Sequence, residues 1–110
     1  ELDLFPIRVN NKYGYIDSTG KVIINPKFDG ASYFHEGLAR IEVNNLVGFI
    51  DKQGSIVITP QFLCAEDFSE GKAVIHSGDV RVPQMYKCGY IDKYGNILIK
   101  PVYEWAERRF

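Results

Sequence analysis

Three copies of one short segment occur along this chain, and their spacing restricts the fold more than any other feature. The copies are Tyr13–Gly20, Val47–Gly54 and Cys88–Gly95; each has glycine at its second position and ends in Asp-x-x-Gly. Counted between the second-position glycines, the copies are 34 and 41 residues apart. A spacing of this size is typical of repeat arrays, in which each unit buries its apolar face against the next.

The copies organise the chain into a single predicted repeat domain, residues 1–110. A strand at 5–11 matches the last strand of a repeat and represents a preceding partial copy. The remaining segments are repeat 1 at about 13–43, repeat 2 at about 47–75, an insertion at 76–87 and a truncated repeat 3 at about 88–110. The insertion accounts for the difference of seven residues between the two spacings.

Each copy predicts a hairpin turn followed by a half-buried strand. The aspartate of Asp17–Gly20 can accept hydrogen bonds from the following backbone amides, and the glycine can adopt the positive φ of a bulged type I turn. The next strand alternates, with an apolar face formed by Val22, Ile24, Pro26 and Phe28. Because proline cannot donate a ladder hydrogen bond, we expect the strand to leave its sheet at Pro26 or to have a free edge there.

A connecting loop and a third strand complete the copy. The loop is predicted over 31–37, and the strand over Leu38–Val43, where apolar and polar residues alternate. Paired asparagines at 10–11 and 44–45 tolerate left-handed backbone and predict tight hairpin loops.

The predicted fold class is all-β, since no stretch has a helical period. We expect tandem repeats of about 34–41 residues with three short antiparallel strands each, arranged as an open, solenoid-like hairpin array. A closed three-fold β arrangement is the alternative, in which the strand at 5–11 completes the last repeat. The copies are too short and too few for a propeller.

The repeated pattern resembles a known family. It reads Gly-aromatic-Ile-Asp-x-x-Gly-x-(Val/Ile)-x-Ile-x-Pro-x-(Phe/Tyr), followed by Phe-x-Glu-Gly-x-Ala, and it is similar to the WG repeat found mostly in bacterial proteins. The tryptophan of the family name is replaced by Tyr13, Val47 and Cys88, so a role of that tryptophan does not carry over. The resemblance implies an extended β-rich array, and it implies no catalytic activity because the family is defined by its repeat.

Charge and composition exclude several classes of function. The 13 basic and 14 acidic residues nearly balance, which predicts no nucleic-acid partner. No apolar run approaches the roughly 20 residues that span a bilayer, so no membrane insertion is predicted. The chain starts at Glu1 without methionine; we expect it to be part of a longer array, and the sequence assigns no localisation.

The residues that resemble chemical sites have structural explanations, and no cofactor or metal is predicted. The repeated aspartates Asp17, Asp51 and Asp92 open turns and are kept apart by the repeat. His35 and His76 occupy different repeat positions and have no zinc-like spacing to a cysteine. Cys64 and Cys88 fill variable packing positions, and a disulfide between them stays open at this stage.

Two groups of residues are candidates for partner contact. Aromatic residues recur near the hairpins, and Tyr15, Phe49 and Tyr90 either fill the core, the favoured interpretation, or stack on a sugar or peptide. Insertions in repeat proteins often lie on a binding face. The candidate contacts are therefore Asp79, Arg81, Met85 and Tyr86 in the insertion, together with Tyr15 and Tyr90.

These observations predict a non-catalytic module for protein–protein interaction or scaffolding within a larger bacterial protein. The expected partner is another protein or the adjacent repeats and domains of the same chain, and exposed repeat ends predict self-association. The alternative is a module that binds a cell-wall glycan or a peptide through exposed aromatic residues. We expect no enzymatic activity.

Overall fold

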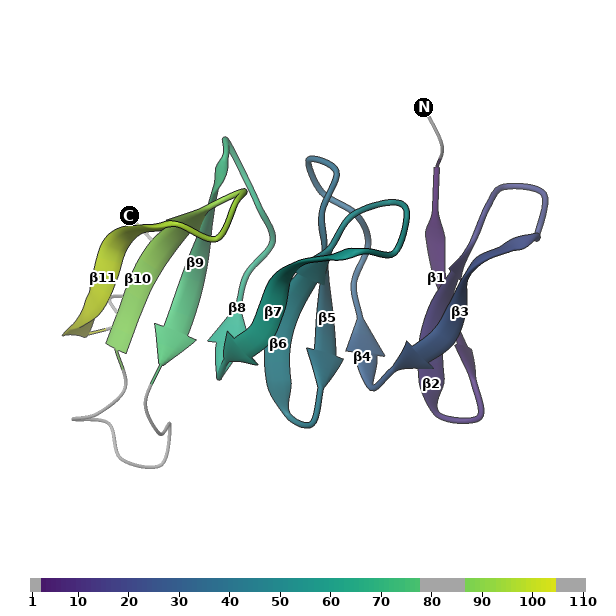
Figure 1. Ribbon diagram of the computed structural model, residues 1–110, viewed down its shortest axis with the longest axis horizontal. Coiled ribbons are helices and arrows are strands. Elements are labelled where there is room, and N and C mark those ends of the chain that lie inside the picture. The colour runs from purple at the N-terminus through teal and green to yellow at the C-terminus, as the bar shows by residue number, and fades with distance from the viewer. Residues whose placement is uncertain (1–2, 78–86, 105–110) are drawn as a thin grey trace.

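Three antiparallel β-sheets follow one another along the length of the molecule (Figure 1). The computed structural model describes the backbone of residues 3–77 and 87–104, and the side chains of 3–76 and 87–101. The molecule measures 45 × 29 × 25 Å, and the part described contains strands and turns but no helix. The predicted all-β class is therefore confirmed.

The strands of each sheet come from two successive sequence copies. The first sheet has the order β1-β2-β3, the second β4-β5-β6-β7 and the third β11-β10-β9-β8. Their bounds are β1 (Phe5–Val9), β2 (Lys12–Ile16), β3 (Val22–Phe28), β4 (Gly30–Ala31), β5 (Ala39–Val43), β6 (Leu46–Ile50), β7 (Ile56–Phe62), β8 (Cys64–Ala65), β9 (Lys72–Ser77), β10 (Lys87–Asp92) and β11 (Ile97–Glu104). The two-residue strands β4 and β8 were not predicted from the sequence, which indicated a loop from residue 31.

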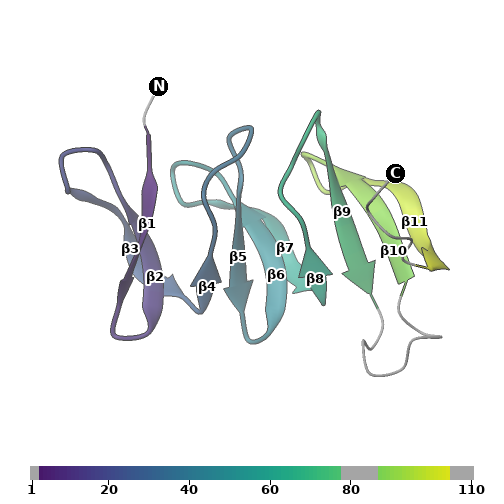
Figure 2. The ribbon, with the colours of Figure 1, turned by 180° about the vertical axis from the view of Figure 1, so that it is seen from behind.

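The array is open. Within the described ranges β1 pairs only with β2, and the first and third sheets lie at opposite ends of the molecule in both views (Figures 1 and 2). The solenoid-like arrangement is therefore correct, and the closed three-fold alternative is wrong. A strand cannot complete the last repeat from the far end of the array.

The turn chemistry predicted from the sequence is confirmed. Asp17 Oδ1 accepts hydrogen bonds from the backbone N–H groups of Thr19 (2.9 Å) and Lys21 (3.1 Å), and Gly20 has φ +91°. The Thr19 hydroxyl donates to the same carboxylate, and this bond together with the two backbone bonds lowers the pKa of Asp17. Equivalent backbone bonds reach Asp51 and Asp92. The paired asparagines all have φ between +51° and +68°, as a tight hairpin requires.

A bulge opposite Gly14 explains why glycine recurs at the second position of each copy. Tyr13 lies opposite Phe28 and Tyr15 lies opposite Ile24, so three residues of β3 face one of β2. A Cβ at Gly14 would lie 2.4 Å from the Ile24 carbonyl oxygen and 2.6 Å from the Pro26 nitrogen. The strand therefore stays in its sheet through the proline, so the first of the two predicted outcomes, that it leaves there, is wrong. The second outcome, a free edge, is confirmed, because β3 is an outer strand of the sheet β1-β2-β3. The bulge needs no hydrogen bond from the proline nitrogen.

The apolar face predicted for the strand after the turn is only partly buried. Ile24 is buried, whereas Val22 is 45% exposed. A second register shift places Val22 opposite Ile16, while Ile24 lies opposite Tyr15. Since Tyr15 and Ile16 point to opposite faces of β2, Val22 and Ile24 also lie on opposite faces. Simple alternation therefore assigned Val22 to the wrong face, and Ile56 and Ile97, 51% and 49% exposed, repeat this.

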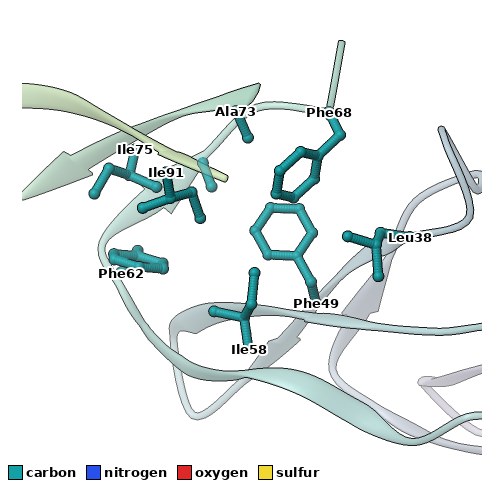
Figure 3. Close-up of a cluster of buried hydrophobic side chains, with 9 residues drawn as sticks. Leu38, Phe49, Ile58, Phe62, Phe68, Ala73, Ile75 and Ile91 are labelled. Carbon is teal, nitrogen blue, oxygen red and sulfur yellow. The ribbon is translucent and has the colours of Figure 1, made fainter. Parts of the chain in front are cut away.

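The hydrophobic core consists of two clusters, one at each contact between successive sheets. We call the contact between the first and second sheets the first joint, and that between the second and third sheets the second joint. The first joint buries Leu4, Tyr15, Ile24, Phe28, Ala39, Ile41 and Ile50; the second buries Leu38, Phe49, Ile58, Phe62, Ala65, Phe68, Ala73, Ile75 and Ile91 (Figure 3). The middle sheet is buried on both faces, since the adjacent β6 residues Phe49 and Ile50 belong to different clusters.

Candidate interaction surfaces

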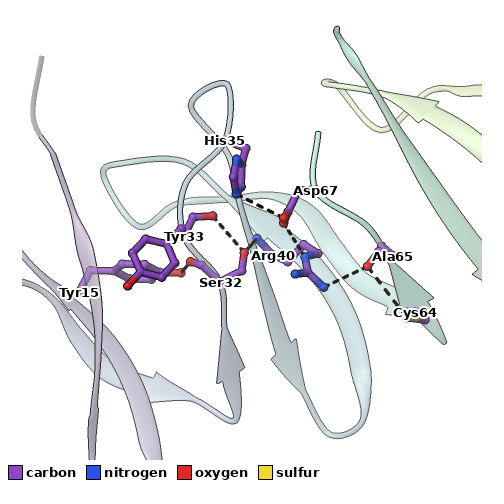
Figure 4. A network of polar contacts seen from close by, with 8 residues as sticks. All are labelled: Tyr15, Ser32, Tyr33, His35, Arg40, Cys64, Ala65 and Asp67. Carbon is purple, nitrogen blue, oxygen red and sulfur yellow. Dashed lines mark hydrogen bonds and ion pairs between the residues drawn. The ribbon is translucent and has the colours of Figure 1, made fainter. Parts of the chain in front are cut away.

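The first joint is centred on Tyr15, which was one of the predicted partner contacts. Its ring packs edge-on against Phe34, with ring centres 4.9 Å apart, and its hydroxyl donates to the Ser32 carbonyl at 2.5 Å (Figure 4). The side chain is fully buried, and this burial raises the pKa of the Tyr15 phenol. A partner cannot reach this ring from solvent, so the core interpretation replaces the predicted contact. Phe34, which packs on it, belongs to the same sequence copy but lies in the segment that leads into the second sheet, and this is not visible in the local sequence.

Polar contacts also bridge the rim of the first joint. The Lys12 ammonium donates to one carboxylate oxygen of Asp29, and the other oxygen accepts a hydrogen bond from the Asn44 backbone N–H at 2.9 Å. The bond from Lys12, with that from Asn44, lowers the pKa of Asp29. Lys12 belongs to the first sheet and Asn44 to the hairpin of the second, so Asp29 links the two sheets.

The second joint has Phe49 in place of Tyr15. Phe49 packs edge-on against Phe68 with ring centres 4.8 Å apart, and both rings are buried (Figure 3). The core interpretation is therefore confirmed for Phe49 as well. Tyr15 and Phe49 are therefore not available for sugar stacking, which leaves Tyr90 alone of the three equivalent positions.

A polar network lies at the rim of the second joint. Arg40 Nε lies 2.7 Å from Asp67 Oδ1, and Arg40 Nη1 donates to the Ala65 carbonyl at 3.2 Å (Figure 4). His35 Nε2 lies 3.3 Å from the other oxygen of Asp67. These side chains are about one-third to one-half exposed, so each ion pair contributes at most about 1 kcal/mol. The network orients the two sheets but leaves its residues in contact with solvent.

Equivalent turns of the second and third sheets stack through Glu36. Its carboxylate accepts hydrogen bonds from the backbone N–H groups of Glu70 (2.6 Å) and Gly71 (2.9 Å), and Lys93 Nζ lies 3.6 Å away. The bond from Gly71 is the main contribution that lowers the pKa of Glu36. Sequence reasoning identified the Phe-x-Glu-Gly motif but not that its glutamate binds the same motif one repeat later.

The third sheet exposes the positions that the joints bury. Ile99 lies opposite Tyr90, as Ile24 lies opposite Tyr15 and Ile58 opposite Phe49. Ile24 and Ile58 are 4% and 3% exposed, but Ile99 is 45% exposed, and Tyr90 is only partly buried. We define the C-terminal end face as Cys88, Tyr90 and Ile99. The predicted contact Tyr90 thus lies on an accessible apolar surface.

The first sheet has a matching exposed surface at the other end. Phe5, Ile7 and Val9 alternate along β1, and Phe5 lies opposite Ile16 of β2, so the four share one face. Their equivalents in the second sheet, Ala39, Ile41, Val43 and Ile50, pack into the first joint. We define the N-terminal end face as Phe5, Ile7, Val9 and Ile16. Phe5 and Val9 are exposed, and Ile7 and Ile16 are partly buried.

Four predicted contact residues in the insertion, Asp79, Arg81, Met85 and Tyr86, lie outside the described residues. The insertion can still be placed, because Ser77 pairs with Lys87 as Val43 pairs with Leu46 in the preceding hairpin. Along the sequence, residues 78–86 thus connect the same two strand ends as residues 44–45 do one repeat earlier.

Register also settles the relation between the two cysteines. His76 of β9 lies opposite Cys64 of β8 and opposite Cys88 of β10, so the three form a row across the third sheet. Cys64 and Cys88 are separated by a whole strand, about 10 Å, which is too far for a disulfide, and neither forms one. Burial raises the pKa of the Cys88 thiol, which disfavours its thiolate.

The row does not form a chemical site of the usual kinds. His76 is buried, with Nε2 3.6 Å from Glu66 Oε2. Over residues 3–76 and 87–101, no three His, Cys, Asp or Glu side chains gather in a way that could hold a metal ion. The same part of the chain includes no helix long and apolar enough to cross a membrane.

An open groove of about 260 Å³ lies beside the second joint. Its walls include Arg40 and Glu42 of β5, Val47 of β6 and the exposed Cys64 of β8. The groove is a shallow depression at the boundary between two sheets, where both charged and apolar groups are accessible.

The chain was compared with known families, proteins and structures. It matches the family described as WG containing repeat in three segments, residues 13–46, 48–78 and 89–110. The matched segments cover most of the sequence, so the resemblance seen in the repeated motif is confirmed. No curated protein and no solved structure gives a significant match.

Proposed function

Since the chain belongs to the WG containing repeat family, we propose that it is a non-catalytic repeat module for protein–protein interaction or scaffolding within a larger bacterial protein. The observation that carries this proposal is the exposure of Tyr90 and Ile99 at positions that are buried in both joints. Exposed apolar surface of this kind is typical of sites where another protein packs. The partner is a protein surface that supplies the contacts otherwise supplied by the next sheet.

A photo-crosslinking residue in place of Tyr90 tests this function. We expect covalent products with protein at position 90 and few at position 94, identified by mass spectrometry. Tyr94 is the matched control because it is 81% exposed, so accessibility alone would favour crosslinking there. Equal crosslinking at the two positions, or none at position 90, would contradict the proposal.

The insertion at 78–86 is proposed as a second contact, through Asp79, Arg81, Met85 and Tyr86. Its place in the array supports this, because it replaces a two-residue turn without changing the strand pairing on either side. Replacing residues 78–86 by Asn-Asn restores the turn of the preceding hairpin. The exchange should weaken partner binding while circular dichroism shows an unchanged fold; unchanged binding would remove the insertion from the site.

The ligand-binding alternative is weaker. Tyr15 and Phe49 are buried, so a glycan could stack on Tyr90 alone among the three equivalent positions. Single aromatic residues bind sugars poorly compared with a row of rings. A glycan array in which the chain binds above background, and a Tyr90→Ala variant does not, would favour this alternative.

A further inference from the structure

The contact between successive sheets includes a turn that lies on an isoleucine. A Cβ built on Gly54 would be 3.3 Å from Ile24 Cγ1, and one built on Gly95 would be 3.3 Å from Ile58 Cγ1. The Asp-x-x-Gly turns of the second and third sheets therefore each pack on the isoleucine of the preceding sheet. The two joints repeat this contact with the same residue types and the same distance.

One Asp-x-x-Gly turn and one isoleucine lack this contact in the described part of the chain, and they lie at opposite ends of the molecule. A Cβ on Gly20 would have no atom within 4 Å, so its turn lies in open space. Ile99 is 45% exposed where its equivalents are buried. The first sheet thus presents the free turn and the third sheet the exposed isoleucine. These two sheets lie at opposite ends of the molecule (Figure 1).

The faces around these two residues also correspond. Inside the molecule, the face that holds Ala39, Ile41 and Ile50 packs against the face that holds Tyr15 and Ile24. The N-terminal end face is the first sheet's equivalent of the face that holds Ala39, Ile41 and Ile50. The C-terminal end face is the third sheet's equivalent of the face that holds Tyr15 and Ile24. Both end faces are apolar, and neither is covered by another sheet in the described part of the chain.

Deepening the interaction function on which it rests, we propose that the occupant of the C-terminal end face is a second copy of this chain, docked head to tail. The Asp17–Gly20 turn of the second copy lies on Ile99 of the first, and its N-terminal end face lies against Tyr90 and Cys88. The contact continues the two joints across the boundary between molecules. Because the two surfaces differ, the association is heterologous and can extend beyond a dimer.

The end faces are large enough for a protein–protein interface. The two shorter dimensions of the molecule, 29 and 25 Å, limit each end face to about 700 Å². A standard protein–protein interface buries about 800 Å² on each partner. The end faces are therefore close to the standard size, and we expect an association that can be followed across a concentration series.

Sedimentation velocity across a concentration series tests the proposal. Ile99→Glu should raise the dissociation constant by at least about tenfold, because a charge would enter an apolar contact. Ile97→Glu is the matched control: its equivalent Ile56 stays 51% exposed although a sheet follows it, so this change should have less than about a twofold effect. Circular dichroism should show that both variants keep the fold, since both side chains are about half exposed.

A mixing experiment distinguishes head-to-tail docking from a symmetric dimer. Ile7→Glu introduces a charge into the N-terminal end face, and Ile99→Glu introduces one into the C-terminal end face. Each variant alone should therefore be monomeric. A mixture of the two retains one intact face of each kind and should form a dimer that does not grow further. A monomeric unmodified chain, a dimer of either single variant or a monomeric mixture would overturn the proposal. If the unmodified chain is monomeric but Tyr90 crosslinks to a different protein, the interaction function stands and only the second copy is excluded.

Discussion

The two joints bury equivalent apolar positions but differ in their polar contacts. The first joint contains Tyr15, whose hydroxyl needs the Ser32 carbonyl, whereas the second contains Phe49 and needs no such acceptor. At the rim, Lys12 and Asp29 of the first joint correspond to Leu46 and Leu63 of the second.

The second joint has polar contacts of its own in other places. Arg40 reaches Asp67 and the Ala65 carbonyl, and Glu36 binds the backbone of the next turn. The glycines, prolines and apolar residues therefore define how sheets pack, and each joint adds the polar contacts that its own sequence permits. This difference can be tested with substitutions that affect both joints, one joint or a single polar group.

The largest effect is expected for Gly48→Ala, which affects the sheet shared by the two joints. A Cβ at Gly48 would lie 2.5 Å from the Ile58 carbonyl oxygen and 2.6 Å from the Pro60 nitrogen, so backbone must move. We expect a loss of about 3 kcal/mol or more in the free energy of unfolding by urea. The control Gly71→Ala meets no atom within 4 Å and has φ +80°, so it should cost only about 1–2 kcal/mol of backbone strain. Equal stability of the two variants would refute the importance of the bulge.

Removing the stacking phenylalanine should weaken the second joint more than the first. Phe68 is buried, whereas its equivalent Phe34 is partly exposed. Phe68→Ala should therefore cost about 3–5 kcal/mol and Phe34→Ala clearly less. Hydrogen exchange, read separately for β1–β3 and β9–β11, would show which sheets lose protection. A larger loss for Phe34→Ala would reverse the comparison.

Exchanging the two central rings tests the polar difference alone. Tyr15→Phe leaves the Ser32 carbonyl without its hydrogen bond and should cost about 1 kcal/mol in thermal or urea unfolding. Phe49→Tyr should be nearly neutral, because Glu66 is the equivalent of Ser32 and its carbonyl could accept the added hydroxyl. The backbone has the same hydrogen bonds at the two places: the Ser32 N–H donates to the Arg40 carbonyl, and the Glu66 N–H donates to the Val74 carbonyl. Equal destabilisation by both changes would mean that each joint accepts only its own ring.

The smallest effect is expected from Glu36, and it should depend on pH. The folded-state pKa of Glu36 lies below its ordinary value, so its stabilising contribution is complete above that value, near pH 4, and is lost as pH falls through the folded pKa. Glu36→Gln should remove this part of the acid sensitivity in melting temperatures measured between pH 7 and 2. Glu70→Gln, at the equivalent position one repeat later, is the control. Identical pH profiles for both variants would argue against the stacked turns.

Local features of the fold could be predicted from the sequence because turn chemistry acts over a few residues. The Asp-x-x-Gly hairpins and the left-handed asparagine pairs are confirmed at every described position. The apolar alternation identified the strand that follows each turn. The order of hairpins and strands, and the open array that they form, followed from the repetition of these local signals.

Features that depend on register or on the next repeat were missed. The bulge at Pro26 and the placement of Val22 on the opposite face need the pairing of β2 with β3. The burial of Tyr15 depends on contacts with the following sheet, Phe34 among them, so the same residue type at position 90 has a different exposure. The row of Cys64, His76 and Cys88 comes from three strands and has no signal in sequence spacing.

The sequence repeat and the sheet are out of phase by two strands, since the chain crosses to the next sheet just after β3 and just after β7, in the middle of each copy. Deleting the residues between two equivalent positions therefore joins two parts of equivalent sheets. Deleting residues 24–57, for example, would fuse the start of β3 to the end of β7 and leave a shorter array with intact packing. Recombination within a gene can thus change the number of units in steps of about 34 codons without inventing a new contact. The number of units can then change while the bulges and turns formed at the glycines of each unit stay the same.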